Sequence, residues 1–174
     1  MKGAIINCLE ELVVNGFGKD KWEAALEKAG FEKYTFFLSI QDIDDAKVLK
    51  KLVGAVCSVL NISLPQAADA FGEYWRCTYA PKNYEIFFSG IKSSKDFLLK
   101  MDKIHHVTTA TIPNAHPPRF DYSWENDKTL IMKYRSPRNL IDFMVGLIKG
   151  VGKHFKEKLA ISKTDDNGVR IVFP

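Results

Sequence analysis

Apolar side chains recur at every third or fourth position over most of the first two thirds of the chain. This spacing gathers them on one face of an α-helix, so it predicts a series of amphipathic helices. Capping residues, glycines and prolines mark where each helix begins and ends. The first two expected helices cover residues 3–14 and 20–29. A third is expected from a cap at 42–45 to about 60, and a fourth from a cap at 63 to about 79, with Pro81 as its stop. A fifth is expected from a cap at 93 or 94 to about 112.

The pattern changes after Pro118, where strand-forming residues appear in short segments. These segments predict strands, and the polar residues between them predict turns. Ser136 and Pro137 have the types expected at an N-cap and at the first helical position. The expected elements are strands at 119–124 and 129–134, a helix from a cap at 136 to about 155, and strands at 158–162 and 169–173 joined by a turn at 165–168. The chain is therefore expected to be one α+β domain over residues 1–174, with a helical N-terminal half and a small, about four-stranded antiparallel sheet.

The helix expected before residue 112 carries a histidine on its apolar face. His105 lies on the same face as Phe97 and Met101, whereas His106 is turned about 100° away, because successive helical residues step by that angle. A histidine on an apolar face needs partners for its ring nitrogens. Two interpretations remain open: a core histidine bonded to a backbone carbonyl, which the isolated pattern favours, and a metal ligand facing an apolar cavity.

A second group of polar side chains follows the second expected strand. Tyr134 and Ser136 point to the same side of an extended segment, and Arg138 comes at the expected opening of the next helix. A phenol, a hydroxyl and a guanidinium beside a helix N-terminus can bind a carboxylate or a phosphate. The alternative is a capping serine beside an exposed arginine, and this simpler interpretation is favoured while the pattern stands alone.

Composition argues against several classes of function. The 174 residues suffice for one domain with a sizeable core, and 46% hydrophobic with 26% charged residues are typical of a soluble globular protein. Basic and acidic residues are interleaved at a net charge of +4, which argues against a nucleic-acid partner. Cys8, Cys57 and Cys77 lack zinc-ligand spacing and are expected to be reduced, mostly buried thiols in a cytoplasmic protein. No apolar run approaches the ~20 residues of a membrane span, and the N-terminus lacks the pattern of a signal peptide, so no membrane partner is expected.

Six short motifs carry a resemblance to one family, and they fall in order along essentially the whole chain. They are MKGAIINCLEELV at residues 1–13, FGEYW at 71–75, MDKIHH at 101–106, AHPPRF at 115–120, YRSPR at 134–138 and GLIKG at 146–150. No single motif is specific, but together they resemble the H-NOX domain, the heme–nitric oxide/oxygen binding module also called HNOB, in its stand-alone bacterial type. The resemblance implies the H-NOX fold, with a distal helical subdomain at about residues 1–62 and a proximal subdomain at about 63–174.

The resemblance also assigns roles to single residues. It makes His105 the axial ligand of the iron in heme b, the iron complex of protoporphyrin IX. It places the heme propionates on Tyr134, Ser136 and Arg138, and it places Pro118 against the porphyrin, which this proline bends. The other residues expected to contact the heme are Met101 and, around the open coordination site, Ile5, Leu9, Trp75, Tyr79, Phe143 and Leu147.

By this resemblance the chain is a gas sensor rather than an enzyme. Oxygen-binding members carry a tyrosine that donates a hydrogen bond to bound O₂, and the matching residue here is Phe143, which cannot donate. We therefore expect ferrous heme to take nitric oxide and carbon monoxide and to exclude O₂, unless Trp75 or Tyr79 donates instead. Nitric oxide weakens the iron–histidine bond in the family, so release of His105 and relaxation of the heme and of its helix would signal to a partner, a bacterial histidine kinase or a cyclic-di-GMP enzyme. No cysteine follows Cys77, so the zinc site of some members is not expected.

Three other functions compete with nitric oxide sensing. An oxygen-binding heme sensor would differ in its distal hydrogen-bond donor. A heme-free adaptor would use residues 134–138 to bind an anion or an acidic partner, with His105 purely structural. A heme enzyme is the least favoured, because peroxidase-like chemistry needs a distal histidine or arginine and the expected distal residues are apolar or aromatic. His116 and His154 are expected at the surface.

Overall fold

The computed structural model describes residues 1–164 and 167–174, and the chain forms two compact units. Unit 1 comprises Met1–Ala67 and unit 2 comprises Ala68–Pro174. Buried apolar side chains are present in each unit, as the amphipathic pattern predicts. In the turn expected at 165–168, Asp165 and Asp166 lie outside the described residues.

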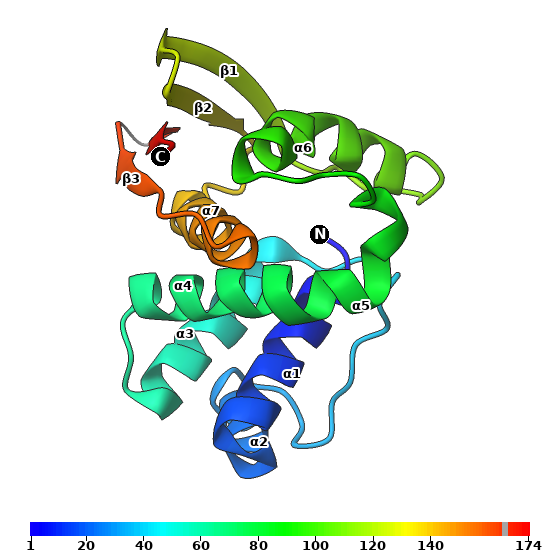
Figure 1. Cartoon of the computed structure of the whole chain (residues 1–174). Helices are drawn as coiled ribbons and strands as arrows, with labels where there is room; N and C mark the ends of the chain where they lie inside the picture. The colour runs from blue at the N-terminus through cyan, green and yellow to red at the C-terminus, as the bar shows by residue number, and fades with distance from the viewer. Residues whose placement is uncertain (165–166) are drawn as a thin grey trace. The chain divides into compact units, whose positions relative to one another are not determined.

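Unit 1 is helical, and α2 packs against both α1 and α3 (Figure 1). Its helices are α1 (Ala4–Phe17), α2 (Lys19–Lys28), the π-helix η1 (Asp45–Leu49) and α3 (Lys50–Leu60). Gly18 separates the first two with a φ of 97°, a left-handed conformation that glycine adopts without strain. The Asp44 carboxylate caps η1 by accepting hydrogen bonds from the N–H groups of Ala46 (3.0 Å) and Lys47 (2.9 Å).

A run of four helical segments continues from residue 64. They are α4 (Leu64–Tyr74), the π-helix η2 (Trp75–Tyr79), α5 (Ala80–Tyr84) and the 3₁₀-helix η3 (Glu85–Phe87). A capping box starts α4, because the Gln66 N–H donates to Ser63 Oγ (3.3 Å) and the Ser63 N–H donates to Gln66 Oε1 (2.8 Å). The expectation that Pro81 stops the helix is wrong. Pro81 lies in the first turn of α5, which follows directly on η2, so the helical run continues past it.

The helix that carries the histidine pair begins where the sequence predicts. This helix is α6 (Ser94–Thr109), and the Asp96 N–H donates to the Oγ of Ser93, its N-cap, at 3.1 Å. It ends at Thr109, short of Pro113, whose ring cannot continue a helical ladder.

The last helix, α7 (Ile141–Phe155), begins later than predicted. Ser136 and Pro137 open a turn instead of the helix. The Ser136 Oγ accepts a hydrogen bond from the Arg138 N–H (3.3 Å), and Asn139 has a φ of 53°. A left-handed residue interrupts a right-handed helix, so α7 starts only after Asn139.

All four predicted strands are present and form one antiparallel sheet in unit 2. They are β1 (Arg119–Asn126), β2 (Thr129–Arg135), β3 (Ala160–Lys163) and β4 (Gly168–Val172), in the order β1-β2-β4-β3. Phe120 on β1 pairs with Tyr134 on β2. The buried face of the sheet shares one apolar core with α6 and α7. The sheet therefore holds β1 and β2 close to the helix that carries His105.

Small residues let the backbones of α4 and α7 touch. A Cβ added at Gly146 would overlap the backbone of Ala68, and one added at Gly150 would overlap the backbone of Gly72. Gly72 is equally close to the carbonyl of Gly146. Only glycine permits this approach, and it brings the aromatic residues of the two helices together.

The cysteines of the chain are free thiols, Cys8 buried, Cys57 half-buried and Cys77 exposed. The expectation of mostly buried thiols therefore fails for Cys77. Among the described residues, no single helix has the length and apolar character of a membrane span, although residues 45–60 and 64–87 meet that criterion when taken together as a bent pair.

Candidate functional site

The two histidines of α6 lie in different surroundings. The His105 side chain is half-buried and His106 is exposed, as their positions on the helix predict. The His105 ring centroid lies 5.4 Å from that of Phe120. Burial lowers the pKa of His105, which favours the neutral imidazole, the form that binds metals.

One ring nitrogen of His105 already has a partner. Nδ1 lies 3.2 Å from the backbone carbonyl oxygen of Pro118. A carbonyl only accepts hydrogen bonds, so Nδ1 carries the proton and donates, and Nε2 keeps its lone pair. Metal-bound histidines commonly have this arrangement, in which the second nitrogen fixes the tautomer and the ring orientation.

A bidentate ion pair fastens the residues after Pro118 to α6. Arg119 Nε donates to Asp102 Oδ1 (2.7 Å), and Arg119 Nη2 donates to Oδ2 (2.5 Å). The Phe120 N–H also donates to Asp102 Oδ1 (3.0 Å). The Arg119 hydrogen bond lowers the pKa of Asp102 to about 2. The segment whose carbonyl orients His105 is therefore tied to the same helix, one turn before that histidine.

A tyrosine hydroxyl from β1 contacts the backbone of α6 at this turn. The Tyr122 hydroxyl donates to the Leu98 carbonyl (2.9 Å) and accepts from the Asp102 N–H (3.3 Å). These backbone groups are four residues apart, the separation of a helical hydrogen bond. Burial raises the pKa of Tyr122 to about 12, so the phenol keeps its proton.

The phenol, hydroxyl and guanidinium predicted to bind an anion lie at the end of β2 and in the turn after it. Tyr134 is buried, with its ring centroid 6.2 Å from that of Phe120, and Ser136 and Arg138 are half-buried. Arg138 Nη1 donates to the carbonyl of His116 at 2.6 Å. Because α7 begins only at Ile141, Arg138 lies three residues before the first helical residue rather than in the first turn of the helix.

A short segment joins the two predicted groups. Residues 116–120 contact Arg138 through the carbonyl of His116 and contact His105 through the carbonyl of Pro118. The segment therefore connects His105 to Arg138, one of the residues predicted to bind an anion, although the two are far apart in the sequence. The side chains of His116 and His154 are exposed, as predicted.

Aromatic residues of α4, η2 and α7 form a second group in unit 2. The ring centroid of Phe71 lies 5.9 Å from that of Trp75 and 5.4 Å from that of Phe143. The ring centroids of Trp75 and Tyr79 are 5.3 Å apart. Tyr84 joins this cluster by stacking on Trp75, with 6.1 Å between the two ring centroids. Three of the predicted distal residues, Trp75, Tyr79 and Phe143, are thus in one cluster.

The remaining predicted residues are distributed over both units. Met101 and Leu147 are half-buried in unit 2, on α6 and α7. Ile5 and Leu9 are on α1 in unit 1, where Ile5 is half-buried and Leu9 is buried.

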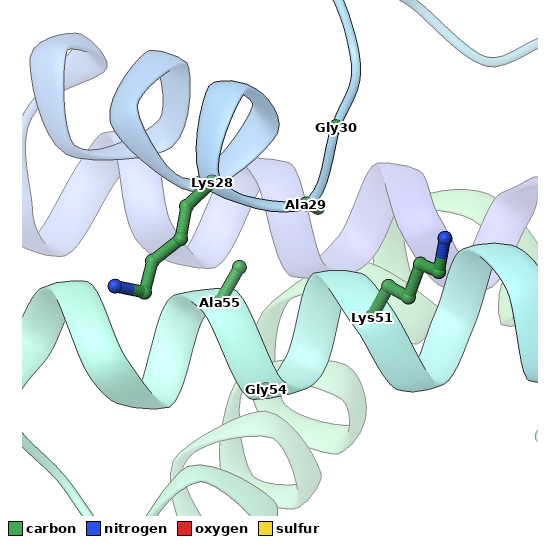
Figure 2. Close-up of a pocket in the computed structure, with 6 residues that line it drawn as sticks. All are labelled: Lys28, Ala29, Gly30, Lys51, Gly54 and Ala55. Atoms are coloured by element: carbon green, nitrogen blue, oxygen red, sulfur yellow. The ribbon is translucent and has the colours of Figure 1, made fainter.

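Unit 1 has a surface hollow, and the residues that line it are not among the predicted site residues. Figure 2 shows it between the end of α2 and α3, lined by Lys28, Ala29, Gly30, Lys51, Gly54 and Ala55. The two lysine side chains extend in different directions, so they do not converge on a ligand (Figure 2). None of the predicted site residues lines this hollow.

The donor set of the site fits heme better than a bare metal ion. Among the described residues, no group of three or more His, Cys, Asp or Glu side chains is placed to hold a metal. A porphyrin supplies four nitrogens of its own, so its iron needs one imidazole from the protein. The ring of His105, whose Nδ1 is bonded to the Pro118 carbonyl, has the chemistry to provide that ligand through Nε2.

Comparison with known proteins gives the same family. The family model described as Haem-NO-binding (HNOB) matches residues 2–163. The chain belongs to the H-NOX family. This family comprises heme-based gas sensor domains, in which the H-NOX module is the sensor and is not catalytic. The predicted family is therefore confirmed.

The H-NOX chain is also similar to soluble guanylate cyclases of Caenorhabditis elegans. It is 28% identical to gcy-32 over 160 residues, which is 88% of this chain and 23% of the relative. It is 24% identical to gcy-35 over 172 residues, which is 95% of this chain and 25% of the relative. The chain spans about a quarter of the length of these curated relatives.

Solved H-NOX structures confirm the predicted fold. An oxygen-binding H-NOX domain related to soluble guanylate cyclases, solved as its oxygen complex, has a TM-score of 0.82 at 25% identity and covers 99% of this chain and 95% of its own. The I5F mutant of T. tengcongensis H-NOX has the same TM-score and identity, over 99% of this chain and 97% of its own.

Sequence reasoning missed several residues that shape this H-NOX site. Phe71 belongs to the aromatic cluster, and its spacing of four from Trp75 and eight from Tyr79 is a helical signal that indicates it. Asp102 and Arg119 are seventeen residues apart in the sequence, and no local pattern marks them as a pair.

Proposed function

We propose that this H-NOX domain binds heme b through His105 and senses nitric oxide. The observation that carries the proposal is the hydrogen bond from His105 Nδ1 to the Pro118 carbonyl, which leaves Nε2 as the ligand nitrogen. Membership of the Haem-NO-binding family supports it. When bound, heme supplies a ferrous iron that takes a diatomic gas, together with two propionate carboxylates.

The polar group after β2 has the chemistry to hold those carboxylates. Tyr134 and Ser136 each offer a hydroxyl donor, and the Arg138 guanidinium matches a carboxylate with two parallel N–H groups. Arg138 also bonds the carbonyl of His116. Binding of a carboxylate by this arginine would therefore fix the segment that carries Pro118.

Phe143 favours nitric oxide and carbon monoxide over O₂. It has no hydrogen-bond donor and packs edge-on against Phe71, at 5.4 Å between ring centroids. Bound O₂ develops negative charge and depends on a donor, whereas nitric oxide and carbon monoxide depend on one much less. We infer that the ferrous protein takes up the latter two gases and does not retain O₂.

An oxygen-binding sensor is the second candidate. Trp75 brings an indole N–H into the same aromatic cluster, stacked on Tyr79 at 5.3 Å. One similar structure is an oxygen-binding H-NOX domain in its oxygen complex. If Trp75 or Tyr79 donates to the bound gas, the reduced protein gives a stable oxy spectrum in air, and the nitric oxide proposal then gives way to this one.

The output of the domain would be a movement of α6. His105 lies near the C-terminal end of α6. Residues 118–120 are hydrogen-bonded to this helix through the side chains of Asp102 and His105. Release of His105 from a ligated iron would therefore displace the helix and this segment together. We propose that a signalling protein, either a histidine kinase or a cyclic-di-GMP enzyme, binds the domain and responds to this displacement.

The decisive experiment is the absorption spectrum of the reduced protein before and after nitric oxide is added. We expect a ferrous heme spectrum that shifts with nitric oxide and with carbon monoxide. His105→Gly should lose heme uptake and regain it with added imidazole, while the matched variant His106→Gly should behave as the wild type. A colourless wild-type protein, or heme uptake by His105→Gly without imidazole, contradicts the proposal and favours a heme-free adaptor.

Phe143→Tyr tests the gas selectivity separately. A phenol at this position supplies the donor that Phe143 lacks, so the reduced variant should hold O₂ with at least about tenfold greater affinity, the equivalent of a hydrogen bond of about 1.4 kcal/mol. Oxygen titration of the reduced protein measures the change. Phe71→Tyr is the matched control, and an equal gain in both variants contradicts the special role of position 143.

A further inference from the structure

Arg76 in unit 2 is a cation that is buried without a paired anion among the described residues. Arg76 is only 3% exposed, and among the described residues its Nε has no hydrogen-bond partner and the residue makes no ion pair. Burial lowers the pKa of Arg76, but arginine stays protonated in proteins, so the charge is present. A buried charge is costly unless other groups compensate for it.

Three aromatic rings from three different segments surround the guanidinium. Its central carbon lies 4.5 Å from the ring centroid of Phe97, 4.9 Å from that of Phe88 and 5.4 Å from that of Phe155. Phe97 in turn lies 5.4 Å from Phe88 and 6.2 Å from Phe155. The negative faces of these rings attract the cation, so Arg76 is the common contact of all three.

The segments that meet at Arg76 also carry residues of the proposed heme site. Arg76 follows Trp75 on η2, the π-helix of the aromatic cluster. Phe97 lies in the first turn of α6, the helix of His105. Phe155 is the last residue of α7, and Phe88 directly follows η3. The guanidinium therefore connects the His105 helix to the aromatic cluster inside one unit.

Packing alone does not explain a cation at this position. An aliphatic side chain of similar length would fill the same space without the cost of burying a charge. A cation held by ring faces is directional, because the attraction falls when a ring slides away from the charge. The π-helix that carries Arg76 is itself a geometry found frequently at functional sites.

We propose that Arg76 is a positioning residue that couples α6 to η2. A shift of α6 moves Phe97 relative to the guanidinium, and the guanidinium transmits that shift to η2 and to the end of α7. The inference rests on the proposed function for its stimulus, because gas binding at His105 is what would move α6. The contact itself is a property of the protein without gas.

Hydrogen exchange of backbone amides tests the coupling on the full chain. The variants are Arg76→Met, which removes the charge, Arg76→Lys, which keeps a cation, and Arg170→Met, the same chemical change at an exposed pair with Glu125. The peptides to follow cover residues 94–104 and 75–84. Without gas, Arg76→Met should exchange several-fold faster than the wild type in both peptides, and Arg76→Lys and Arg170→Met should not. Wild-type exchange in Arg76→Met overturns the proposal.

Nitric oxide provides the second measurement. In the reduced wild type it should change exchange in both peptides, and in Arg76→Met it should change only residues 94–104. A response at 75–84 that persists in Arg76→Met overturns the coupling. If nitric oxide changes nothing in the wild type, the proposed function fails, but the gas-free comparison still decides whether Arg76 holds α6.

Urea unfolding separates coupling from packing. Arg76→Met removes the cost of a buried charge together with the cation–π contacts, so it should unfold at a urea concentration close to that of the wild type. Unfolding at a clearly lower concentration, with faster exchange in every helix, shows a purely structural role and overturns the proposal.

Discussion

At the scale of single residues, the Asp102 carboxylate links α6 to the segment that orients His105. It accepts two hydrogen bonds from Arg119 and one from the Phe120 N–H. Its pKa falls from 3.8 to about 2, chiefly because of the Arg119 hydrogen bond. Since the folded value is the lower one, the ionised carboxylate stabilises the folded protein above about pH 4, and this contribution is lost as the pH falls toward 2.

We predict that Asp102→Asn lowers the free energy of unfolding by about 1 kcal/mol at pH 7, a modest amount because Arg119 is half exposed. Urea unfolding measured from pH 7 to pH 2 should show this difference constant above about pH 4 and vanishing near pH 2. Asp121→Asn is the matched control, because Asp121 pairs with Arg135 where both side chains are exposed. A difference between wild type and Asp102→Asn that persists unchanged at pH 2 contradicts the assignment.

The sequence predicts the residues of the site whose signal is local. A helical step separates the half-buried His105 from the exposed His106, and their sequence positions suffice to distinguish them. The carbonyl that orients His105 belongs to Pro118, thirteen residues away and beyond the end of the helix. The three aromatic rings around Arg76 come from three different segments of the chain. Such contacts depend on tertiary packing, which no spacing pattern in one chain specifies.

At the scale of elements, Tyr122 attaches β1 to α6 through the helix backbone. Its hydroxyl joins the Leu98 carbonyl and the Asp102 N–H. We predict that Tyr122→Phe lowers the free energy of unfolding by about 1 kcal/mol, the usual value of a lost buried hydrogen bond, and speeds amide exchange at Asp102. Tyr34→Phe is the control, because Tyr34 is exposed. Unchanged exchange at residues 98–102 would show that the hydroxyl does not hold this turn.

The hydrophobic pattern predicts elements better than it predicts their ends. It predicts α1 and α6 because each buries one continuous face. It does not reveal the π-helices η1 and η2, because a change of hydrogen-bond register leaves most of the apolar spacing intact. The late start of α7 follows from the left-handed Asn139, a backbone conformation that a Ser-Pro pair does not signal.

At the scale of the whole molecule, heme binding and folding must be linked. A group that binds the folded chain and not the unfolded chain adds RT ln(1 + [L]/Kd) to stability, about 2.7 kcal/mol at one hundred times Kd. We therefore predict that the heme-loaded protein unfolds at a higher urea concentration than the heme-free protein, with a difference that grows with free heme.

His105 should carry most of that stabilisation, because in the proposed site its Nε2 would supply the bond from the protein to the iron. Urea unfolding of His105→Gly should show little gain on heme addition, and imidazole should restore it by supplying the missing ligand. His106→Gly should gain as much as the wild type, because His106 is exposed and points away from the apolar face. Equal stabilisation of both variants by heme would mean that the porphyrin binds without the iron–histidine bond. Movement of α6 could not then report on the gas.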